Sequence, residues 1–201
     1  MYVRTIYAIG DPAKIDACVD ALREEAPRAL AGQPGYRGFA LFTDRELGKI
    51  LTGSWWESEQ ALRNSDDQLK ERRATMLAPF ADTVTVDSWE AAVFTPPAEV
   101  GPGAGFRLTR FEIDPSGADL LVETFRDATL PKVRAIAGFE TAAMLLDRAR
   151  GRGSVGVVYT DQAALAASRG KQAAARGEAV TKTGVSIRSL EEFEVVTLER
   201  Q

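Results

Sequence analysis

The chain has 201 residues, of which 45% are apolar and 27% are charged, a composition typical of a soluble globular protein. Its net charge of −4 argues against nucleic-acid or anionic-membrane binding, and no apolar run reaches the roughly 20 residues of a membrane span. The chain contains no histidine and one cysteine, which excludes His-based nucleophile pairs, His-ligated zinc or haem, and an internal disulfide. Because the first residues also lack the apolar stretch of a signal peptide, we expect a cytoplasmic protein that binds no nucleic acid, membrane or metal.

The first half alternates strand-like and helical segments. Its first β-rich run ends at Gly10, where Asp11 can cap a helix and Pro12 can occupy the first helical turn. Apolar residues at helical spacing follow, and a charged turn later separates two strand-like runs as in an antiparallel hairpin. The expected elements are strands at 2–9, 36–43, 49–56 and 83–94 and helices at 12–30 and 58–79, the second helix broken near Asn64-Ser65.

The second half predicts the same order of elements after a linker. The segment 96–105 is rich in proline and glycine, which sustain neither a helix nor a strand ladder, so we interpret it as the linker. The expected elements beyond it are a strand from Phe106, a helix from Pro115, a hairpin over 139–159, a helical region from Asp161 and a strand over 190–199.

Residues of the first half recur in the second half at one spacing. Gly35-Tyr36 recurs as Gly138-Phe139, an offset of 138 − 35 = 103 residues. Turn residues and apolar positions recur while most surface positions differ, which is typical of two diverged copies of one small domain. Further pairs at this offset are Asp11-Pro12 with Asp114-Pro115, Arg23 with Arg126, Gly53 with Gly156, and Ala61-Leu62 with Ala164-Leu165.

Each copy therefore has the order β-α-β-β-α-β, which predicts an α+β fold of two tandem ferredoxin-like repeats. We expect domains at 1–95 and 106–201, joined by the linker at 96–105. A domain of this size has a small core, and each sheet has one face that its own helices do not cover. We therefore expect the two repeats to pack as an internal pseudo-dimer, an intramolecular form of the dimeric α/β barrel, with monomer and homodimer both left open.

Short motifs in this chain resemble the antibiotic biosynthesis monooxygenase (ABM) family of the dimeric α/β barrel superfamily. In the first half these are Pro34-Gly35-Tyr36, which opens the second strand, and the run WWESEQAL over 55–62, where strand turns into helix. The second half keeps only Ala137-Gly138-Phe139 and the run YTDQAAL over 159–165. The resemblance covers nearly the whole chain in topology, and it implies the fold given above.

The resemblance also implies a range of activities. The family includes oxygenases that oxidise aromatic polyketide intermediates without metal or flavin, and it includes haem-degrading enzymes. The haem-degrading branch uses an axial His on the helix after the Trp motif and an Asn on the first strand. Here the helix offers Ser65, Arg72 and Thr75 and the strand offers Arg4 and Thr5, so the residues argue against haem degradation.

Trp56 is the main candidate for a binding residue. Strand alternation places Trp55 and Trp56 on opposite faces of the sheet, so one of them faces the helices. In the functional interpretation, Trp56 lines a cavity between sheet and helices and stacks on a planar ligand. In the structural interpretation, Trp56 fills the core at the end of the strand, as Tyr159 does in the second half.

Three further residues complete the candidate substrate-binding set of the first half. The hydroxyls of Tyr7 and Tyr36 could orient a phenolic substrate, and Arg72 could stabilise a phenolate. Each also has an ordinary explanation, because tyrosines are common in strands and Arg72 could belong to a solvated helical face. The second-half equivalents of Trp56 and Tyr36 are Tyr159 and Phe139.

Cys18 is a weak candidate for a catalytic nucleophile. Its equivalent at the offset of 103 residues is Leu121, on an apolar helical face. A thiol that replaces a core leucine is typically buried and inert.

Two functions remain open at this point. One is a cofactor-independent monooxygenase that acts on a planar phenolic or polyketide-like small molecule, with its site in the first half. The other is a non-catalytic small-molecule-binding or interaction protein that keeps the ABM-like fold. The drift of the second half, where the Trp pair has become Val158-Tyr159, favours the second function for that half.

Overall fold

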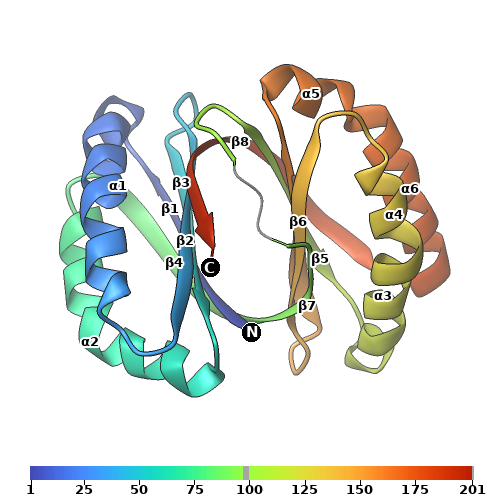
Figure 1. Cartoon of the computed structure of the whole chain (residues 1–201), viewed down its shortest axis with the longest axis horizontal. Coiled ribbons are helices and arrows are strands. Elements are labelled where there is room, and N and C mark those ends of the chain that lie inside the picture. The colour runs from blue at the N-terminus through green and yellow to red at the C-terminus, as the bar shows by residue number, and fades with distance from the viewer. Residues whose placement is uncertain (97–99, 201) are drawn as a thin grey trace. The chain divides into compact units, whose positions relative to one another are not determined.

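The computed structural model describes residues 1–96 and 100–200 (Figure 1). The linker expected at 96–105 therefore lies partly outside the described residues, at 97–99. The chain divides into two compact units. Unit 1 comprises Met1–Trp89 and Glu194–Gln201, and unit 2 comprises Glu90–Phe193.

Unit 1 contains a sheet whose helices, α1 and α2, lie side by side next to it (Figure 1). Asp11 accepts a hydrogen bond from the backbone N–H of Ala13, so the expected cap is present, and Ser58 caps the second helix by accepting one from Ala61. The elements are β1 (Tyr2–Gly10), a 3-10 turn (Pro12–Lys14), α1 (Ile15–Ala31), β2 (Tyr36–Asp44), β3 (Lys49–Trp56), α2 (Glu59–Leu77) and β4 (Ala81–Phe94).

Unit 2 repeats the order with two changes in its helices. The first helical segment contains a π-helical turn, and the second is divided at Ser168. The elements are β5 (Gly105–Glu112), a 3-10 turn (Pro115–Gly117), α3 (Ala118–Thr124), the π-helical turn (Phe125–Thr129), α4 (Leu130–Arg134), β6 (Phe139–Asp147), β7 (Arg152–Tyr159), α5 (Gln162–Ala167), α6 (Arg169–Thr183) and β8 (Ser186–Arg200).

The strand pairing repeats with the same offset as the sequence. Tyr2 pairs with Trp56 in unit 1, and Gly105 pairs with Tyr159 in unit 2. The register also shifts at matching places, between Tyr36 and Gly38 in β2 and between Phe139 and Thr141 in β6. The expected fold class, an α+β protein with two repeated ferredoxin-like units and an eight-stranded antiparallel sheet, is confirmed.

Two strands continue from one unit into the other. The strand order is β1-β3-β2-β8-β5-β7-β6-β4. The first part of β4 belongs to unit 1 and its last residues pair with β6 in unit 2, while the end of β8 pairs with β2 in unit 1. The domain boundaries at 95 and 106 stay a prediction from the sequence. The compact units change at 89/90 and 193/194, within these two long strands.

The expected break in the helix at Asn64-Ser65 is wrong for the first repeat. There α2 is continuous through Ser65. The side chain of Ser65 donates a hydrogen bond to the carbonyl oxygen of Leu62 within the helix. The break occurs instead at Ser168, the equivalent position of the second repeat. Serine bonds of this kind to the preceding turn weaken or bend a helix without necessarily ending it.

Each unit has its own apolar core between helices and sheet. The unit 1 core includes Ile15, Leu22, Leu41, Trp56 and Leu62. The unit 2 core is built the same way, with Leu121, Phe125, Met144, Tyr159 and Leu165 at its centre. Among the described residues, no helix combines the length and the apolar character that crossing a membrane requires.

Replacing Gly35 tests how closely the residue before β2 packs against α2. Its φ is +78°, and a Cβ there would lie 2.8 Å from the Cβ of Ala61 on α2. We expect Gly35→Ala to lower the free energy of unfolding by about 1–3 kcal/mol, because it adds both backbone strain and a steric overlap.

The matched control is Gly32→Ala at the end of α1. Gly32 has φ −78°, and a Cβ added there would meet no atom within 4 Å, so its replacement should leave stability unchanged or slightly higher. Urea unfolding of both variants measures the difference. Equal midpoints for the two variants would show that Gly35 is not constrained as described.

Candidate functional site

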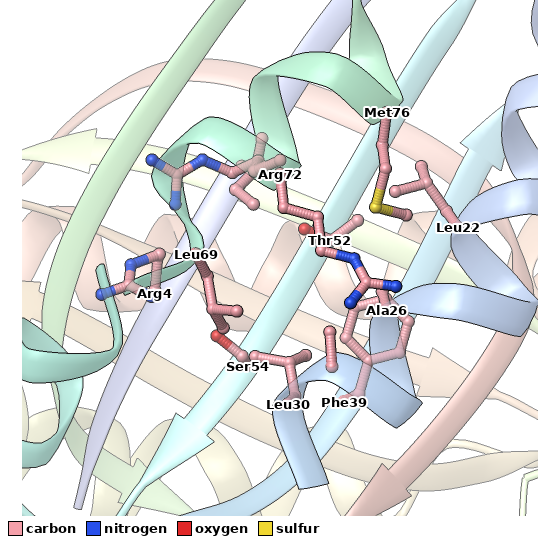
Figure 2. A pocket seen from close by; sticks show the side chains of 13 residues that line it. Arg4, Leu22, Ala26, Leu30, Phe39, Thr52, Ser54, Leu69, Arg72 and Met76 are labelled. Carbon is pink, nitrogen blue, oxygen red and sulfur yellow. The ribbon is translucent and has the colours of Figure 1, made fainter. Parts of the chain in front are cut away.

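A pocket of about 60 Å³ lies in unit 1 between α1, α2 and the sheet (Figure 2). Both helices and strands β1 and β2 contribute apolar side chains to its lining. Strands β1 and β3 and helix α2 contribute three arginines and two hydroxyl groups. The apolar side chains are Ile6, Leu22, Leu30, Phe39, Leu69 and Met76, and the polar ones are Arg4, Thr52, Ser54, Arg72 and Arg73.

Arg4 is a buried arginine on β1, and its side chain is only 3% exposed. Its guanidinium donates to Ser65 Oγ at 3.0 Å and to the carbonyl oxygen of Leu62, so it ties the strand to α2. It also lies 5.7 Å from the ring centroid of Trp56. Burial lowers the pKa of Arg4, and the nearby carboxylate of Asp66 opposes that effect.

Asp66 balances the charges of two arginines that line the pocket. It lies 3.5 Å from Arg4 Nε and accepts a hydrogen bond from Arg73 at 2.7 Å. Burial alone would raise the pKa of Asp66, but the hydrogen bond from Arg73 and the two positive charges together hold it below its usual range. Asp66 is therefore an ionised partner for two arginines and a poor proton acceptor at neutral pH.

Arg72 lies at the mouth of the pocket. Its side chain runs from α2 toward Ala26 on α1, and its Nη2 atom lies 3.4 Å from Glu25 (Figure 2). Both side chains of this pair are about half exposed, so the pair contributes little to stability. Arg72 is a candidate substrate-binding residue predicted from the sequence, and it belongs to the lining of the pocket.

Trp56 and Tyr36 lie behind the lining of the pocket. Trp56 is fully buried and faces the helices, and its indole N–H donates to Ser54 Oγ at 3.0 Å. Tyr36 meets it edge to face at 5.8 Å between ring centroids. Burial and the charge of Glu199 raise the pKa of Tyr36 to about 12, so this phenol stays protonated. Trp56 therefore acts on the pocket through Arg4 and Ser54.

Tyr7 lies on the other face of the sheet. The β1 residues that face the helices are Arg4, Ile6 and Ala8, and alternation along the strand turns Tyr7 away from them. The structure thus brings Arg72, Trp56 and Tyr36 to one side of the sheet and places Tyr7 on the opposite side.

The second repeat contains the same polar arrangement. Arg107, at the position of Arg4, donates to Ser168 Oγ at 2.8 Å and to the carbonyl oxygen of Leu165 at 2.8 Å. Its guanidinium lies 6.0 Å from the ring of Tyr159, whose hydroxyl donates to Gln172 at 3.3 Å. Phe139, the equivalent of Tyr36, is half-buried against the unit 2 core.

Sequence reasoning missed the role of the two buried arginines. A single arginine in a strand usually indicates a solvated side chain, so the sequence of one repeat alone does not indicate a buried contact for Arg4. The signal was present in the repeat, because Arg4 and Ser65 recur as Arg107 and Ser168 at the offset of 103 residues. A charged residue that recurs together with its hydrogen-bond partner indicates a buried structural contact.

Among the residues that the structure describes, no three histidine, cysteine or carboxylate side chains converge as a metal site requires. Cys18 is buried in the unit 1 core, and its sulfur lies 3.9 Å from the carbonyl oxygen of Met76. Burial raises the pKa of Cys18 to about 11. The thiol is therefore neutral at physiological pH, as expected for a residue at a core leucine position.

Comparison with known proteins shows similarity of the first repeat to one protein family. Residues 1–68 match the model of the family described as antibiotic biosynthesis monooxygenase. This segment holds β1, α1, β2, β3 and the start of α2, which supply most of the pocket lining. The chain is also 26% identical over 184 residues to an uncharacterised protein of Mycobacterium tuberculosis strain H37Rv, covering 92% of this chain and 82% of that protein.

Solved structures share the fold across both repeats. An anthrone oxidase-like protein has a TM-score of 0.73 at 16% identity, covering 99% of this chain and 92% of that chain. A heme-degrading enzyme from Listeria monocytogenes has a TM-score of 0.56 at 6% identity, covering 96% and 99%. At such low identity these likenesses show the fold alone, since one fold supports different activities.

Replacing Arg4 tests the contact between β1 and α2. We expect Arg4→Ala to lower the free energy of unfolding by about 2–4 kcal/mol, because it removes several buried hydrogen bonds and leaves a space in the core. The control is Arg63→Ala, which removes an exposed ion pair with Glu59 and should change stability by less than about 1 kcal/mol. Similar losses in both variants, measured by urea unfolding, would contradict the buried role of Arg4.

Alkylation of Cys18 tests its environment. With its pKa raised to about 11, the thiol carries little thiolate at pH 8. We expect iodoacetamide to modify the native protein roughly 100-fold more slowly than the protein in guanidinium chloride, where the thiol has an ordinary pKa. Cys18 is the only cysteine in the chain, so mass spectrometry reads its modification directly. Comparable rates in the two states would contradict the buried, neutral thiol.

Proposed function

Because residues 1–68 match the ABM family model, we propose that the protein is a monooxygenase that uses no cofactor and oxidises a planar phenolic small molecule in the unit 1 pocket. One observation carries the proposal. The segment that matches the family builds most of an apolar pocket with a weakly held guanidinium, that of Arg72, at its mouth.

The proposed reaction needs only a reactive substrate and oxygen. An activated CH₂ group beside a phenolic ring loses a proton, and the resulting anion reduces O₂ to form a carbon–oxygen bond. The peroxide then breaks its O–O bond, so that CH₂ becomes C=O and the second oxygen atom leaves as water. The protein contributes a site that excludes water and positive charge that stabilises the anion.

Arg72 is the residue that we assign to the anion. Its guanidinium can exchange the exposed contact with Glu25 for the phenolate oxygen, a charge-assisted interaction. Trp56 and Tyr36 support the site from behind, since Trp56 positions Ser54 and contacts Arg4. The proton leaves to solvent at the mouth, because the charged side chains that line the pocket are arginines.

The size of the pocket limits how the substrate enters. A dry cavity that holds benzene has a volume of about 150 Å³, so a pocket of about 60 Å³ takes only part of a ring until side chains move. Met76 and Arg72 are long and unbranched, so they adapt more readily than the other lining residues. We propose that a planar substrate enters edge first as these two side chains move apart.

A non-catalytic small-molecule-binding role is the second candidate. It is favoured by the same lining, in which the described residues offer arginines and hydroxyl groups but no side chain that accepts a proton near neutral pH. In that case the pocket binds a phenolic ligand and releases it unchanged. The two candidates share the site and differ in oxygen consumption.

Oxygen uptake distinguishes the two candidates. With 1,8-dihydroxyanthrone as the probe, we expect uptake above the uncatalysed rate and a pH profile that follows the acidity of the probe, since the pocket holds no titrating base. Ala26→Phe fills the pocket from α1 and should reduce the rate at least tenfold. Ala17→Phe, on the exposed face of the same helix, should leave the rate unchanged.

Calorimetric titration with the oxidised product completes the test. Saturable binding that Ala26→Phe abolishes, without oxygen uptake by the native protein, would overturn the enzyme and leave the binding role. Two results would contradict both candidates. One is that the native protein shows neither oxygen uptake nor saturable product binding. The other is that Ala26→Phe and the native protein have equal uptake rates and equal product affinities.

A further inference from the structure

The second repeat contains a pocket at the equivalent place. It also has a volume of about 60 Å³ and lies between the sheet and helices of unit 2. Most of its lining corresponds to the first pocket at the offset of 103 residues, with Phe125 at the position of Leu22 and Val133 at that of Leu30. The repeat has therefore kept the cavity although most of its side chains have changed.

The charge in this second pocket is arranged differently. Arg176 corresponds to Arg73, and both line their pockets. Arg73 is paired with Asp66, but the position of Asp66 is occupied by Arg169 in the second repeat. A carboxylate has thus been replaced by a guanidinium beside a pocket that keeps its arginine.

Arg169 is paired with a carboxylate that Arg107 also uses. Glu192 lies 2.6 Å from Arg107 and 2.6 Å from Arg169. Hydrogen bonds from Arg169 and Arg107 outweigh burial and hold the pKa of Glu192 below its usual range. Among residues 1–96 and 100–200, Arg176 has neither an ion pair nor a hydrogen bond, and only burial and the charge of Arg107 act on its pKa, both lowering it.

The remaining lining supplies hydrogen-bonding groups and apolar surface. Thr109, Thr129 and Gln172 stand where the first pocket has Ile6, Ala26 and Leu69. The rest is apolar and includes Phe125, Val133 and Met144. A half-buried, unpaired guanidinium beside apolar and polar groups suits a ligand with one negative charge and a small hydrocarbon part.

We propose that the unit 2 pocket binds a small apolar carboxylate, of single-ring or branched-aliphatic size, whose carboxylate pairs with Arg176. The ligand supplies the negative charge that Asp66 supplies in the first repeat. This site is separate from the unit 1 pocket, and it does not depend on the monooxygenase proposal.

The test uses benzoate as the probe and benzamide as its neutral counterpart, with calorimetry on the full-length protein. We expect saturable benzoate binding that is at least tenfold tighter than benzamide binding. Arg176→Gln should weaken benzoate at least tenfold and leave benzamide unchanged. Lys171→Gln removes an exposed positive charge from the same helix and should have no effect on either compound.

A second pair of variants tests the charge argument itself. Arg169→Asp restores the carboxylate of the first repeat, so it should pair with Arg176 and weaken benzoate binding at least tenfold. Arg169→Gln removes the same positive charge without adding a carboxylate, and it should retain most of the benzoate affinity. Backbone amide shifts in NMR spectra should localise benzoate to Val157 and Ala179 in the lining.

Several results would overturn the proposal. These are the absence of saturable benzoate binding, equal affinity for benzoate and benzamide, unchanged benzoate binding by Arg176→Gln, and shifts confined to unit 1. Circular dichroism of each variant separates loss of binding from loss of folding, and the benzamide titration provides the same check within the binding experiment.

Discussion

The contact on which the rest of each unit depends is a buried arginine that joins the first strand to the second helical segment. Arg4 and Arg107 each donate to a serine hydroxyl and to a backbone carbonyl of that segment, and each lies beside the aromatic residue that ends the hairpin. Burying a guanidinium is costly unless its donors are satisfied, so the helix must lie where its carbonyl and serine can meet them. The position of the helix over the sheet, and hence the space beneath it, follows from that requirement.

The two units differ in the charges around that shared contact. In unit 1 the carboxylate of Asp66 balances Arg4 and Arg73, and the remaining flexible guanidinium, Arg72, lies at the mouth of the pocket. In unit 2 the carboxylate that balances Arg107 is Glu192 from β8. Among the described residues, Arg176 has no carboxylate partner. Gene duplication allows this kind of divergence, because one copy can keep an activity while the other changes its ligand. We accordingly assign different ligand chemistry to two pockets of the same architecture.

The sequence predicted the order of elements well, because glycines, prolines and caps at turns recur at a fixed offset and depend little on tertiary contacts. It predicted the site less well. Whether Trp56 lines a pocket depends on neighbouring side chains, and here Ser54 and Arg4 come between Trp56 and the cavity. The break at Ser168 and the continuity of α2 at Ser65 also differ for tertiary reasons, since both serines make the same local bond. The π-helical turn at Phe125–Thr129 does not show in the length of the helical segment, because this segment is equally long in the two repeats.

The most direct test of two pockets with different ligands is a crystal structure of the protein grown with both 1,8-dihydroxyanthraquinone and benzoate. The account predicts the planar ring system between α1, α2 and the unit 1 sheet, with its oxygen on Arg72, and benzoate in unit 2 with its carboxylate on Arg176. Ring density that avoids the unit 1 pocket, or benzoate bound away from Arg176, would contradict it.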